Sequence, residues 1–205
     1  MSSKKPLIVF EGIEGSGKTT LIKYISNYLK SKKLSFINIR EPGGNKNSEK
    51  IRKLILNKKN KFNSFTDLML YLAARSENIE KVIKKNYKKK IILLDRFTDS
   101  TIAYQHYGMG LDKTLINKIN KILLNNIKPN LVFLNLINMK NLRYRLYRRK
   151  NKNRYDKFDI NFYKKVQIGF IKLSKNKSNY VIIDSNKNLS HNKKKALESI
   201  KKLIK

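Results

Sequence analysis

Cysteine is absent from this 205-residue sequence, acidic residues are few, and no long apolar run is present. Without cysteine, disulfide bonds and thiolate metal sites are excluded. No stretch approaches the roughly 20 apolar residues that a membrane-spanning helix requires. The start from Met1 to Pro6 leads directly into a short apolar run and does not resemble a signal peptide. We therefore expect a soluble, cytoplasmic protein that makes no contact with a membrane.

The scarcity of acids leaves a strongly basic chain, because 14 Asp and Glu stand against 48 Lys and Arg, a formal net charge of +34. Such a balance would attract polyanions, as in a nucleic-acid-binding protein. The alternative interpretation is codon bias, since Lys, Asn and Ile crowd the polar stretches and the excess is spread along the chain. We favour codon bias and expect nucleic-acid binding to be non-specific at most.

Short apolar runs alternate with longer amphipathic stretches throughout the chain. The runs are rich in Val, Ile, Leu and Phe and nearly continuous, which is typical of strands buried on both faces. This order predicts an α/β fold, with a five-stranded parallel sheet and helices on both faces, in one domain over residues 1–205. The predicted strands are Leu7–Glu11, Phe36–Arg40, Ile91–Asp95, Leu131–Leu136 and Tyr180–Asp184. The predicted helices are Lys18–Ser31, Ser48–Leu56, Thr66–Asn86, Lys113–Asn125, Met139–Arg149, Asn161–Ser174 and Ser190–Ile204.

A glycine-rich segment follows the first predicted strand and opens the first predicted helix. Residues 12–19 fit the pattern G-x-x-x-x-G-K-[ST] in the context that this motif requires. Glycines let the backbone wrap around phosphates, while successive N–H groups and the helix N-terminus form an anion nest. We therefore predict a P-loop NTPase fold in which Lys18 reaches the β- and γ-phosphates of ATP and Thr19 ligates Mg²⁺. The predicted nucleotide-binding residues are Gly12, Ile13, Glu14, Gly15, Ser16, Gly17, Lys18 and Thr19.

The third predicted strand ends in an acid and a base, Asp95 and Arg96. Ligands in open α/β sheets collect at the carboxyl ends of the strands, and an acid there can hold Mg²⁺ directly or through water. Arg96 would direct its planar guanidinium toward phosphate. The alternative interpretation is an ordinary ion pair at a strand end.

Five segments occur in a characteristic order and spacing. They read FEGIEGSGKTT at 10–20, REPGG at 40–44, YLAAR at 71–75, DRFTDS at 95–100 and AYQ at 103–105. Together they resemble thymidylate kinase over nearly the full length of the chain. The resemblance implies ATP-dependent phosphorylation of dTMP to dTDP with Mg²⁺, for dTTP synthesis, by a homodimeric enzyme.

The same resemblance implies roles for side chains of the acceptor site. Tyr71 would stack on thymine, and Arg75 would read a base carbonyl, since positions i and i+4 share a helix face. Core packing is the alternative for Tyr71. Arg96 would grip the acceptor phosphate, and Tyr104 would crowd the sugar 2′ position and favour deoxyribose. The other predicted contacts are Glu14 near the acceptor sugar and the metal, Arg40 in the turn that shapes the acceptor site, and Ser100, Thr101 and Gln105 around the base.

Arginines cluster in or just before Lys150–Lys157, a polar stretch without periodicity that we expect to be part of a mobile lid at about 148–157. Phosphoryl transfer needs cations near the transferring oxygens, and positions 13–16 of the P-loop supply none. The resemblance implies that lid arginines supply them, with Arg149 and Arg154 as the catalytic pair and Arg145 next. The alternative is surface charge, although this chain prefers lysine. The predicted catalytic residues are Lys18, Asp95, Arg96, Arg149 and Arg154, and the predicted metal ligands are Thr19, Asp95 and Glu14.

Two departures from the family pattern concern the lid and a loop. Asn153 stands where an acid often precedes the second lid arginine, and Met109 stands where an arginine is usual. Both bear on turnover or on lid and loop positioning more than on the class of reaction. Two other functions stay open from the sequence: a kinase for another nucleoside monophosphate, and an ATPase stimulated by nucleic acid.

Overall fold

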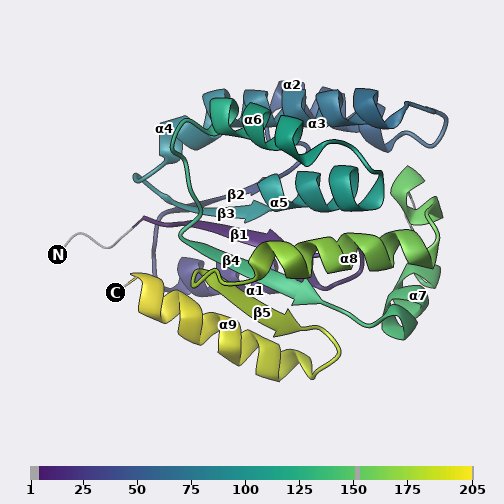
Figure 1. Cartoon of the computed structure of the whole chain (residues 1–205). Helices are drawn as coiled ribbons and strands as arrows, with labels where there is room; N and C mark the ends of the chain where they lie inside the picture. The colour runs from purple at the N-terminus through teal and green to yellow at the C-terminus, as the bar shows by residue number, and fades with distance from the viewer. Residues whose placement is uncertain (1–4, 151–152, 205) are drawn as a thin grey trace.

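The computed structural model describes residues 5–150 and 153–204, which form a sheet with helices on both faces (Figure 1). Five parallel strands lie in the order β2-β3-β1-β4-β5. Each strand has the bounds that the sequence predicts. They are β1 (Leu7–Glu11), β2 (Phe36–Arg40), β3 (Ile91–Asp95), β4 (Leu131–Leu136) and β5 (Tyr180–Asp184).

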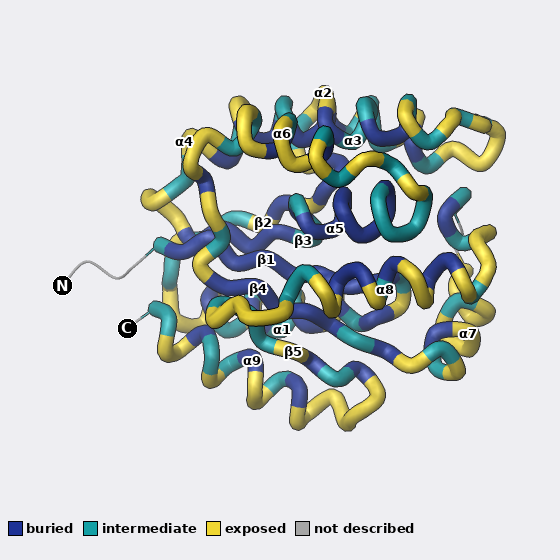
Figure 2. Tube along the Cα trace, in the orientation of Figure 1, coloured by how far each residue is buried: buried dark blue, intermediate teal, exposed yellow. Residues whose placement is uncertain are grey.

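The central strand, β1, is buried along its whole length, which explains its unbroken apolar run (Figure 2). Its side chains alternate between the two faces. Ile8 and Phe10 pack in a cluster with α1 (Lys18–Ser31) and α9 (Leu189–Ile204), whereas Leu7 and Val9 belong to a cluster on the other face. Parallel pairing therefore brings the carboxyl ends of all five strands to one edge of the sheet.

Other helices flank the second face of the sheet. They are α2 (Lys46–Leu56), α3 (Ser64–Asn78), η1 (Ile79–Ile83), α4 (Lys84–Asn86), α6 (Lys113–Leu124) and α8 (Ile160–Ser174). The predicted helix Thr66–Asn86 thus corresponds to α3, η1 and α4 end to end, with η1 wound as a π-helix. The other predicted helix ends either agree with the structure, as at both ends of α1, or differ by one or two residues. At α2 the shift follows from the cap, since the Asn45 side chain accepts hydrogen bonds from the N–H groups of Asn47 and Ser48.

One helical segment was missed by the sequence analysis. The chain after β3 forms α5 (Thr98–Thr101) and continues as the π-helix η2 (Ile102–Gly108). Every residue from Asp99 to Gln105 is buried. Its buried side chains include the polar Asp99, Ser100, Thr101 and Gln105. Polar and apolar residues therefore do not separate with the period of 3.6 residues by which helices are recognised.

The predicted loop Lys150–Lys157 also needs correction, because part of it is helical. α7 (Met139–Tyr147) ends two residues before Arg149, and η3 (Arg154–Lys157) forms a 3₁₀ turn. Asn153 caps that turn in a reciprocal pair with Asp156. Positions 151–152 of the predicted lid lie outside the described residues. Over the described parts of the chain, none of the helices has the length and apolarity needed to cross a bilayer.

Candidate active site

A cavity of about 820 Å³ lies at the carboxyl edge of the sheet. Its lining comes from the P-loop, the ends of β3, β4 and β5, and α3, η2, α7 and η3. The structure brings most of the predicted site residues together there: Glu14, Gly15, Ser16, Gly17, Lys18, Thr19, Arg40, Tyr71, Arg75, Asp95, Arg96, Ser100, Thr101, Tyr104, Gln105, Arg145 and Arg149. Among the described residues, Gly12, Ile13 and Arg154 are not part of this lining.

The P-loop depends on glycine at its first position. Gly12 has a φ of +135°, a conformation that side chains disfavour, and a Cβ there would lie 2.4 Å from the carbonyl oxygen of Asn135. Gly17 caps the N-terminus of α1 in the left-handed region, with φ +87°. The loop therefore passes close to the end of β4 before it turns into α1.

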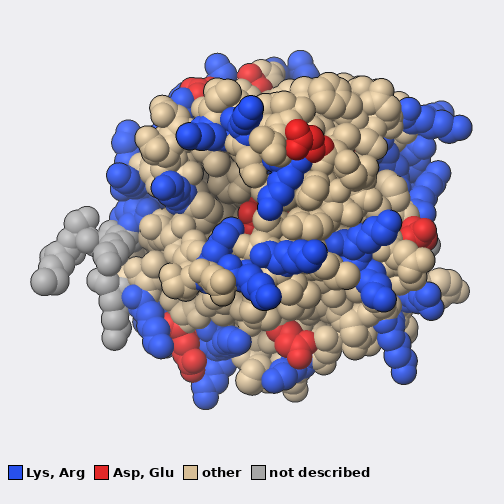
Figure 3. Space-filling view, viewed as in Figure 1, with Lys and Arg blue, Asp and Glu red and all other residues tan. Residues whose placement is uncertain are grey.

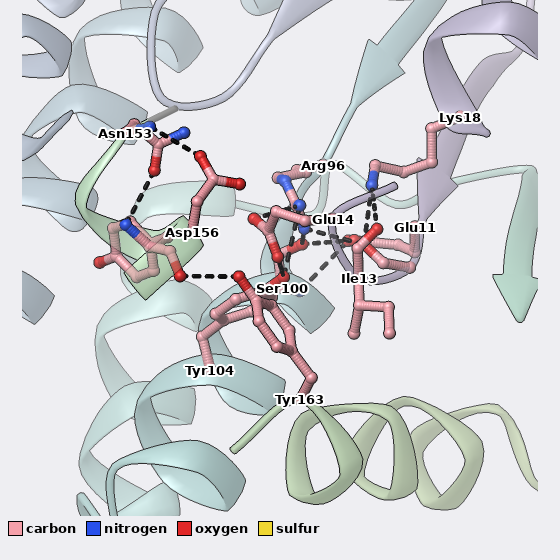
Figure 4. Close-up of polar contacts among 12 residues, drawn as sticks. Glu11, Ile13, Glu14, Lys18, Arg96, Ser100, Tyr104, Asn153, Asp156 and Tyr163 are labelled. Carbon is pink, nitrogen blue, oxygen red and sulfur yellow. Dashed lines mark hydrogen bonds and ion pairs between the residues drawn. The ribbon is translucent and has the colours of Figure 1, made fainter. Parts of the chain in front are cut away.

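Lys18 folds back onto the loop that precedes it. Its Nζ donates to the carbonyl oxygens of Gly12 and Ile13 at 2.8 and 2.9 Å (Figure 4). Burial, followed by repulsion from Arg96, lowers the pKa of Lys18 from 10.5 to about 8. The charged amine is therefore held in an unfavourable environment, which an anion in the cavity would relieve.

Three side chains that the sequence analysis did not assign to the P-loop hold it from the strand ends and α7. Asn135 Nδ2 and Ser185 Oγ donate to the carbonyl oxygen of Ser16 at 3.2 and 2.6 Å. Arg145 donates to the carbonyl oxygens of Gly15 and Ser185 at 2.8 and 2.9 Å. With the outward carbonyl groups engaged in this way, the loop is rigid before any ligand binds.

Arg96 connects the P-loop with the ring of Tyr104. Its backbone lies in the left-handed region, with φ +68°, as is found at sites where local strain is retained for function. Its guanidinium donates to Gly12 O at 2.9 Å and forms an ion pair with Glu14 at 2.9 Å (Figure 4). The Cζ atom lies 5.1 Å from the centroid of the Tyr104 ring, a cation–π contact. An ordinary ion pair at the strand end, the alternative considered from the sequence, does not account for the contacts of Arg96 with Gly12, Glu14 and Tyr104.

Glu14 has both carboxylate oxygens engaged. Oε1 accepts from Arg96, and Oε2 accepts from the hydroxyl of Tyr104. Burial acts to raise the pKa of Glu14, but Arg96 and Lys18 outweigh it and hold the pKa below its usual value. The carboxylate is thus charged at neutral pH and holds Arg96 and Tyr104 in place, which leaves less capacity for the predicted role as a metal ligand.

The residues predicted to hold Mg²⁺ fit that ion as a partial ligand set. Thr19, in the first turn of α1, and Asp95, at the end of β3, both line the cavity. No group of three or more potential metal-ligating side chains occurs within residues 5–150 and 153–204. Mg²⁺ typically takes one or two protein oxygens and completes its shell with water and phosphate oxygens, so this sparse set suits Mg²⁺ bound with a nucleotide.

Glu11, at the end of β1, holds the turn that follows β3. Its Oε1 accepts from the N–H groups of Phe97 and Ser100 at 2.8 and 3.2 Å, and its Oε2 accepts from the Ser100 hydroxyl at 2.5 Å. Burial, followed by repulsion from Asp99, raises the pKa of Glu11 from 4.5 to about 7. The protonation state of this buried acid therefore changes near neutral pH.

The raised pKa of Glu11 gives a testable dependence of stability on pH. The folded state binds this proton more tightly than the unfolded chain, so the contribution is fully present below pH 4.5 and is lost as the pH rises through about 7. Glu11→Gln keeps an acceptor at Oε1 but does not titrate. Between pH 5 and 8, urea unfolding should show the wild type losing about 2–3 kcal/mol relative to the variant. A constant difference across this range would contradict the assignment.

An aromatic wall formed by three tyrosine rings bounds one side of the cavity. Tyr71 on α3 and Tyr104 on η2 each meet the ring of Tyr155 edge to face, with centroids 6.1 and 6.0 Å apart. Tyr155 belongs to η3, is buried, and was not predicted as a site residue. Burial raises the pKa of Tyr71 to about 12, so its hydroxyl stays protonated at neutral pH. A planar base would meet apolar ring surface on this side.

The two lid arginines predicted as a catalytic pair lie in different places. Arg149 lines the cavity and forms an ion pair at 2.7 Å with the buried carboxylate of Asp156. Arg154 points away from the cavity lining and pairs with Asp67 on α3, between the rings of Phe62 and Tyr155. In this conformation Arg154 does not reach the P-loop, so its catalytic role stays a prediction that requires the pair with Asp67 to open.

A further cation of the site was missed by the sequence analysis. Arg52 on α2 lines the cavity, and its Nη1 donates to the carbonyl oxygen of Pro42 at 2.6 Å. Burial, followed by repulsion from Arg40, lowers its pKa. The same signal that marked the lid, an arginine in a chain that prefers lysine, was available for Arg52.

Comparison with known proteins decides the family to which this site belongs. A family model described as thymidylate kinase matches residues 10–196. This chain belongs to the thymidylate kinase family. The resemblance predicted from the five sequence segments is confirmed. The function is accordingly that of a thymidylate kinase, a phosphotransferase that converts dTMP to dTDP.

Individual relatives agree with this family assignment along most of the chain. The thymidylate kinase of Sulfurihydrogenibium sp. is 40% identical over 197 residues, which cover 95% of this chain and 96% of that protein. That of Wolbachia pipientis is 42% identical over 167 residues, or 80% of this chain and 82% of the relative. The crystal structure of thymidylate kinase from Ehrlichia chaffeensis has a TM-score of 0.76 at 32% identity, covering 97% of this chain and 98% of that one. The predicted fold is thus confirmed.

Proposed function

We propose that ATP and dTMP meet head to head in the 820 Å³ cavity, and that the γ-phosphoryl group passes in line to the acceptor phosphate. The observation that supports this arrangement is the shared lining: Lys18 of the P-loop, Arg96 at the end of β3 and Tyr71 of α3 face one cavity. In-line transfer needs little covalent chemistry from the protein. Positioning and charge neutralisation therefore account for catalysis.

On the donor side, the backbone N–H groups of residues 12–19 bind the ATP phosphates, and Lys18 leaves its carbonyl partners to contact them. Mg²⁺ supplies charge neutralisation between the phosphates when it is bound, with Thr19 and Asp95 as protein ligands. Arg149 approaches from the lid, oriented by Asp156. The prediction that Arg154 joins it is retained here as part of the proposal.

On the acceptor side, Arg96 binds the phosphate of dTMP, with Glu14 holding its guanidinium. Tyr71 stacks on the thymine ring, and Arg75 donates to a base carbonyl. Tyr104 lies beside the sugar and disfavours a 2′-hydroxyl group. Arg40, Ser100, Thr101 and Gln105 complete the pocket, and Arg52 adds a second cation near the acceptor phosphate.

A panel of acceptors tests this arrangement directly. ADP release should be fast with dTMP, slower with dUMP, and close to the background rate with UMP and dGMP, because ribose meets Tyr104 and a purine exceeds the pocket. Omission of Mg²⁺ should abolish the reaction. Equal rates with UMP and dTMP would refute the proposed role of Tyr104, and a reaction independent of any nucleotide acceptor would refute the shared cavity.

The alternative of a nucleic-acid-stimulated ATPase is favoured only by the net charge of +34. Lys and Arg side chains are distributed over much of the face shown in Figure 3, around its rim as well as across its middle. Such a distribution supports non-specific attraction rather than a defined groove. Added DNA or RNA should leave the dTMP-dependent rate unchanged at physiological salt; stimulation would support the alternative.

A homodimer is also part of the proposal. Large apolar side chains on the outer layer of helices support it: Leu54 of α2, Phe65 of α3 and Ile122 of α6 are 49%, 51% and 77% exposed. Light scattering coupled to size exclusion would test the mass in solution.

A further inference from the structure

The guanidinium group of Arg75 is held by three acceptors from three different parts of the chain. Nε donates to Glu41 Oε2 at 2.8 Å, Nη1 to Asn120 Oδ1 at 2.8 Å, and Nη2 to the carbonyl oxygen of Phe97 at 2.9 Å. Arg75 is 2% exposed yet lines the cavity. Since a guanidinium group has five N–H donors, about two remain for a ligand. Where they point depends on how the three acceptors orient the plane.

Asn120 stands out among these acceptors. It lies on α6, is 5% exposed, and does not belong to the cavity lining formed by the described residues. Its Nδ2 has no hydrogen-bond partner among the described residues, so Oδ1 bonded to Arg75 is the engaged end of the amide. A buried amide with an unpaired NH₂ group is unfavourable for folding, by about 1–3 kcal/mol. An apolar residue such as the buried Ile116, one turn earlier, would suit the interior better.

The three acceptors differ in what they can do for Arg75. Glu41 is buried, and its carboxylate places the opposite charge beside Nε of Arg75. The Phe97 carbonyl belongs to the backbone and comes with the turn after β3. Asn120 is a neutral side chain that holds Nη1 of Arg75 without adding charge. It therefore affects how the guanidinium plane is rotated, while Glu41 balances the charge of Arg75.

We propose that Asn120 is a positioning residue that sets the orientation of Arg75 and thereby the selection of the acceptor base. This inference rests on the proposed function, because it assigns the remaining N–H groups of Arg75 to a carbonyl oxygen of the base. A fixed donor pair meets a carbonyl favourably and an exocyclic amino group unfavourably. Asn120 therefore contributes to discrimination between dTMP and dCMP, whose amino group replaces one carbonyl of thymine.

The test compares two substitutions of Asn120. One is expected to weaken dTMP binding but not stability, and the other to lower stability but not dTMP binding. Asn120→Leu has a similar volume and removes the acceptor oxygen. It should raise the KM for dTMP about tenfold, which corresponds to about 1.4 kcal/mol, and should reduce the preference for dTMP over dCMP, while kcat and the KM for ATP change less than about twofold. Its melting temperature should stay close to that of the wild type, because the unpaired NH₂ group is removed as well.

Asn120→Asp retains the acceptor oxygen but buries a second carboxylate beside Glu41. It should lower the melting temperature and keep the KM for dTMP close to the wild-type value. A merely structural role predicts the reverse order, in which the less stable variant binds dTMP worse. Ile116→Val is the control: it perturbs the packing of α6 but removes no hydrogen-bond partner of Arg75, so it should change stability alone.

The proposal is overturned if Asn120→Leu binds dTMP as the wild type does, if Asn120→Asp impairs dTMP binding as strongly as Asn120→Leu, or if the KM for ATP rises in parallel. Should the leucine variant not fold, Asn120→Ala removes the same oxygen and takes its place. Failure of the proposed function is seen separately, because the wild type itself would then show no preference for dTMP in the acceptor panel.

Discussion

Lys18→Ala is expected to lower kcat by about 10³-fold, the upper range for loss of a single group that stabilises developing charge. Lys18 belongs to the P-loop, is the first residue of α1, and lines the cavity. Its present partners are the carbonyl oxygens of Gly12 and Ile13, so it is placed to exchange them for phosphate oxygens. ADP release in the presence of dTMP measures the effect. Lys23→Ala, on the exposed side of the same helix, serves as the control and should keep full activity.

The same variant should be more stable than the wild type at neutral pH. Because the pKa of Lys18 falls to about 8 in the folded protein, the charged amine is destabilising below that pH, by about 3 kcal/mol for the full shift. The difference should shrink as the pH rises from about 8 to about 10.5, where the unfolded chain also loses the proton. Thermal melts at pH 7 and pH 10 measure this. An inactive variant that is also less stable at pH 7 would indicate a structural role.

Arg96→Ala should reduce kcat/KM for dTMP by about 10³-fold while changing the KM for ATP less than about threefold. The substitution removes the cation that is proposed to bind the acceptor phosphate. It also leaves the Glu14 carboxylate without its ion pair, so a negative charge then opposes the phosphate of dTMP. Steady-state kinetics with each substrate varied in turn separate the two effects.

Arg96→Lys is the matched control for this prediction. Lysine retains the charge but lacks the planar fork with which Arg96 contacts Gly12 and Glu14 together, so it should recover only a small part of the activity. Full recovery with lysine would show that charge alone matters. An equal loss of ATP and dTMP binding in Arg96→Ala would move this residue to the donor side of the cavity.

The sequence was sufficient to predict those features whose determining residues all lie within one short segment. The five strands have their predicted bounds because each contains a short apolar run. Burial on both faces holds for β1, β3 and β4, whereas the edge strands β2 and β5 are largely half-buried or exposed, which corrects the expectation for those two strands. The P-loop was predictable because its glycines, Lys18 and Thr19 lie within eight residues, so one short segment contains the whole motif. Tyr71 and Arg75 were assigned through the family resemblance; α3 places both in the cavity lining, and their roles stay predictions.

Prediction failed where burial removed the pattern or where partners are distant in sequence. The helical segment from Thr98 to Gly108 has no separate polar stripe because polar side chains are buried in it together with apolar ones. The catalytic role of Arg154 was predicted from the family resemblance and stays a prediction, but the sequence did not show that its charge is paired with Asp67, 87 positions earlier in the numbering. The site residues Arg52 and Tyr155 lie in segments whose local sequence contains no motif.

The amino-acid sequence alone determined the family, the order of strands and helices, and the phosphate-binding loop, because these follow from periodicity and from residues close together in the chain. The tertiary structure decided which side chains hold the reactive ones. Asn135 and Ser185 support the P-loop from two other strands, and Asn120 holds Arg75 from 45 positions away. A hydrogen bond between distant segments depends on the packing of the whole sheet and its helices, so no local pattern encodes it.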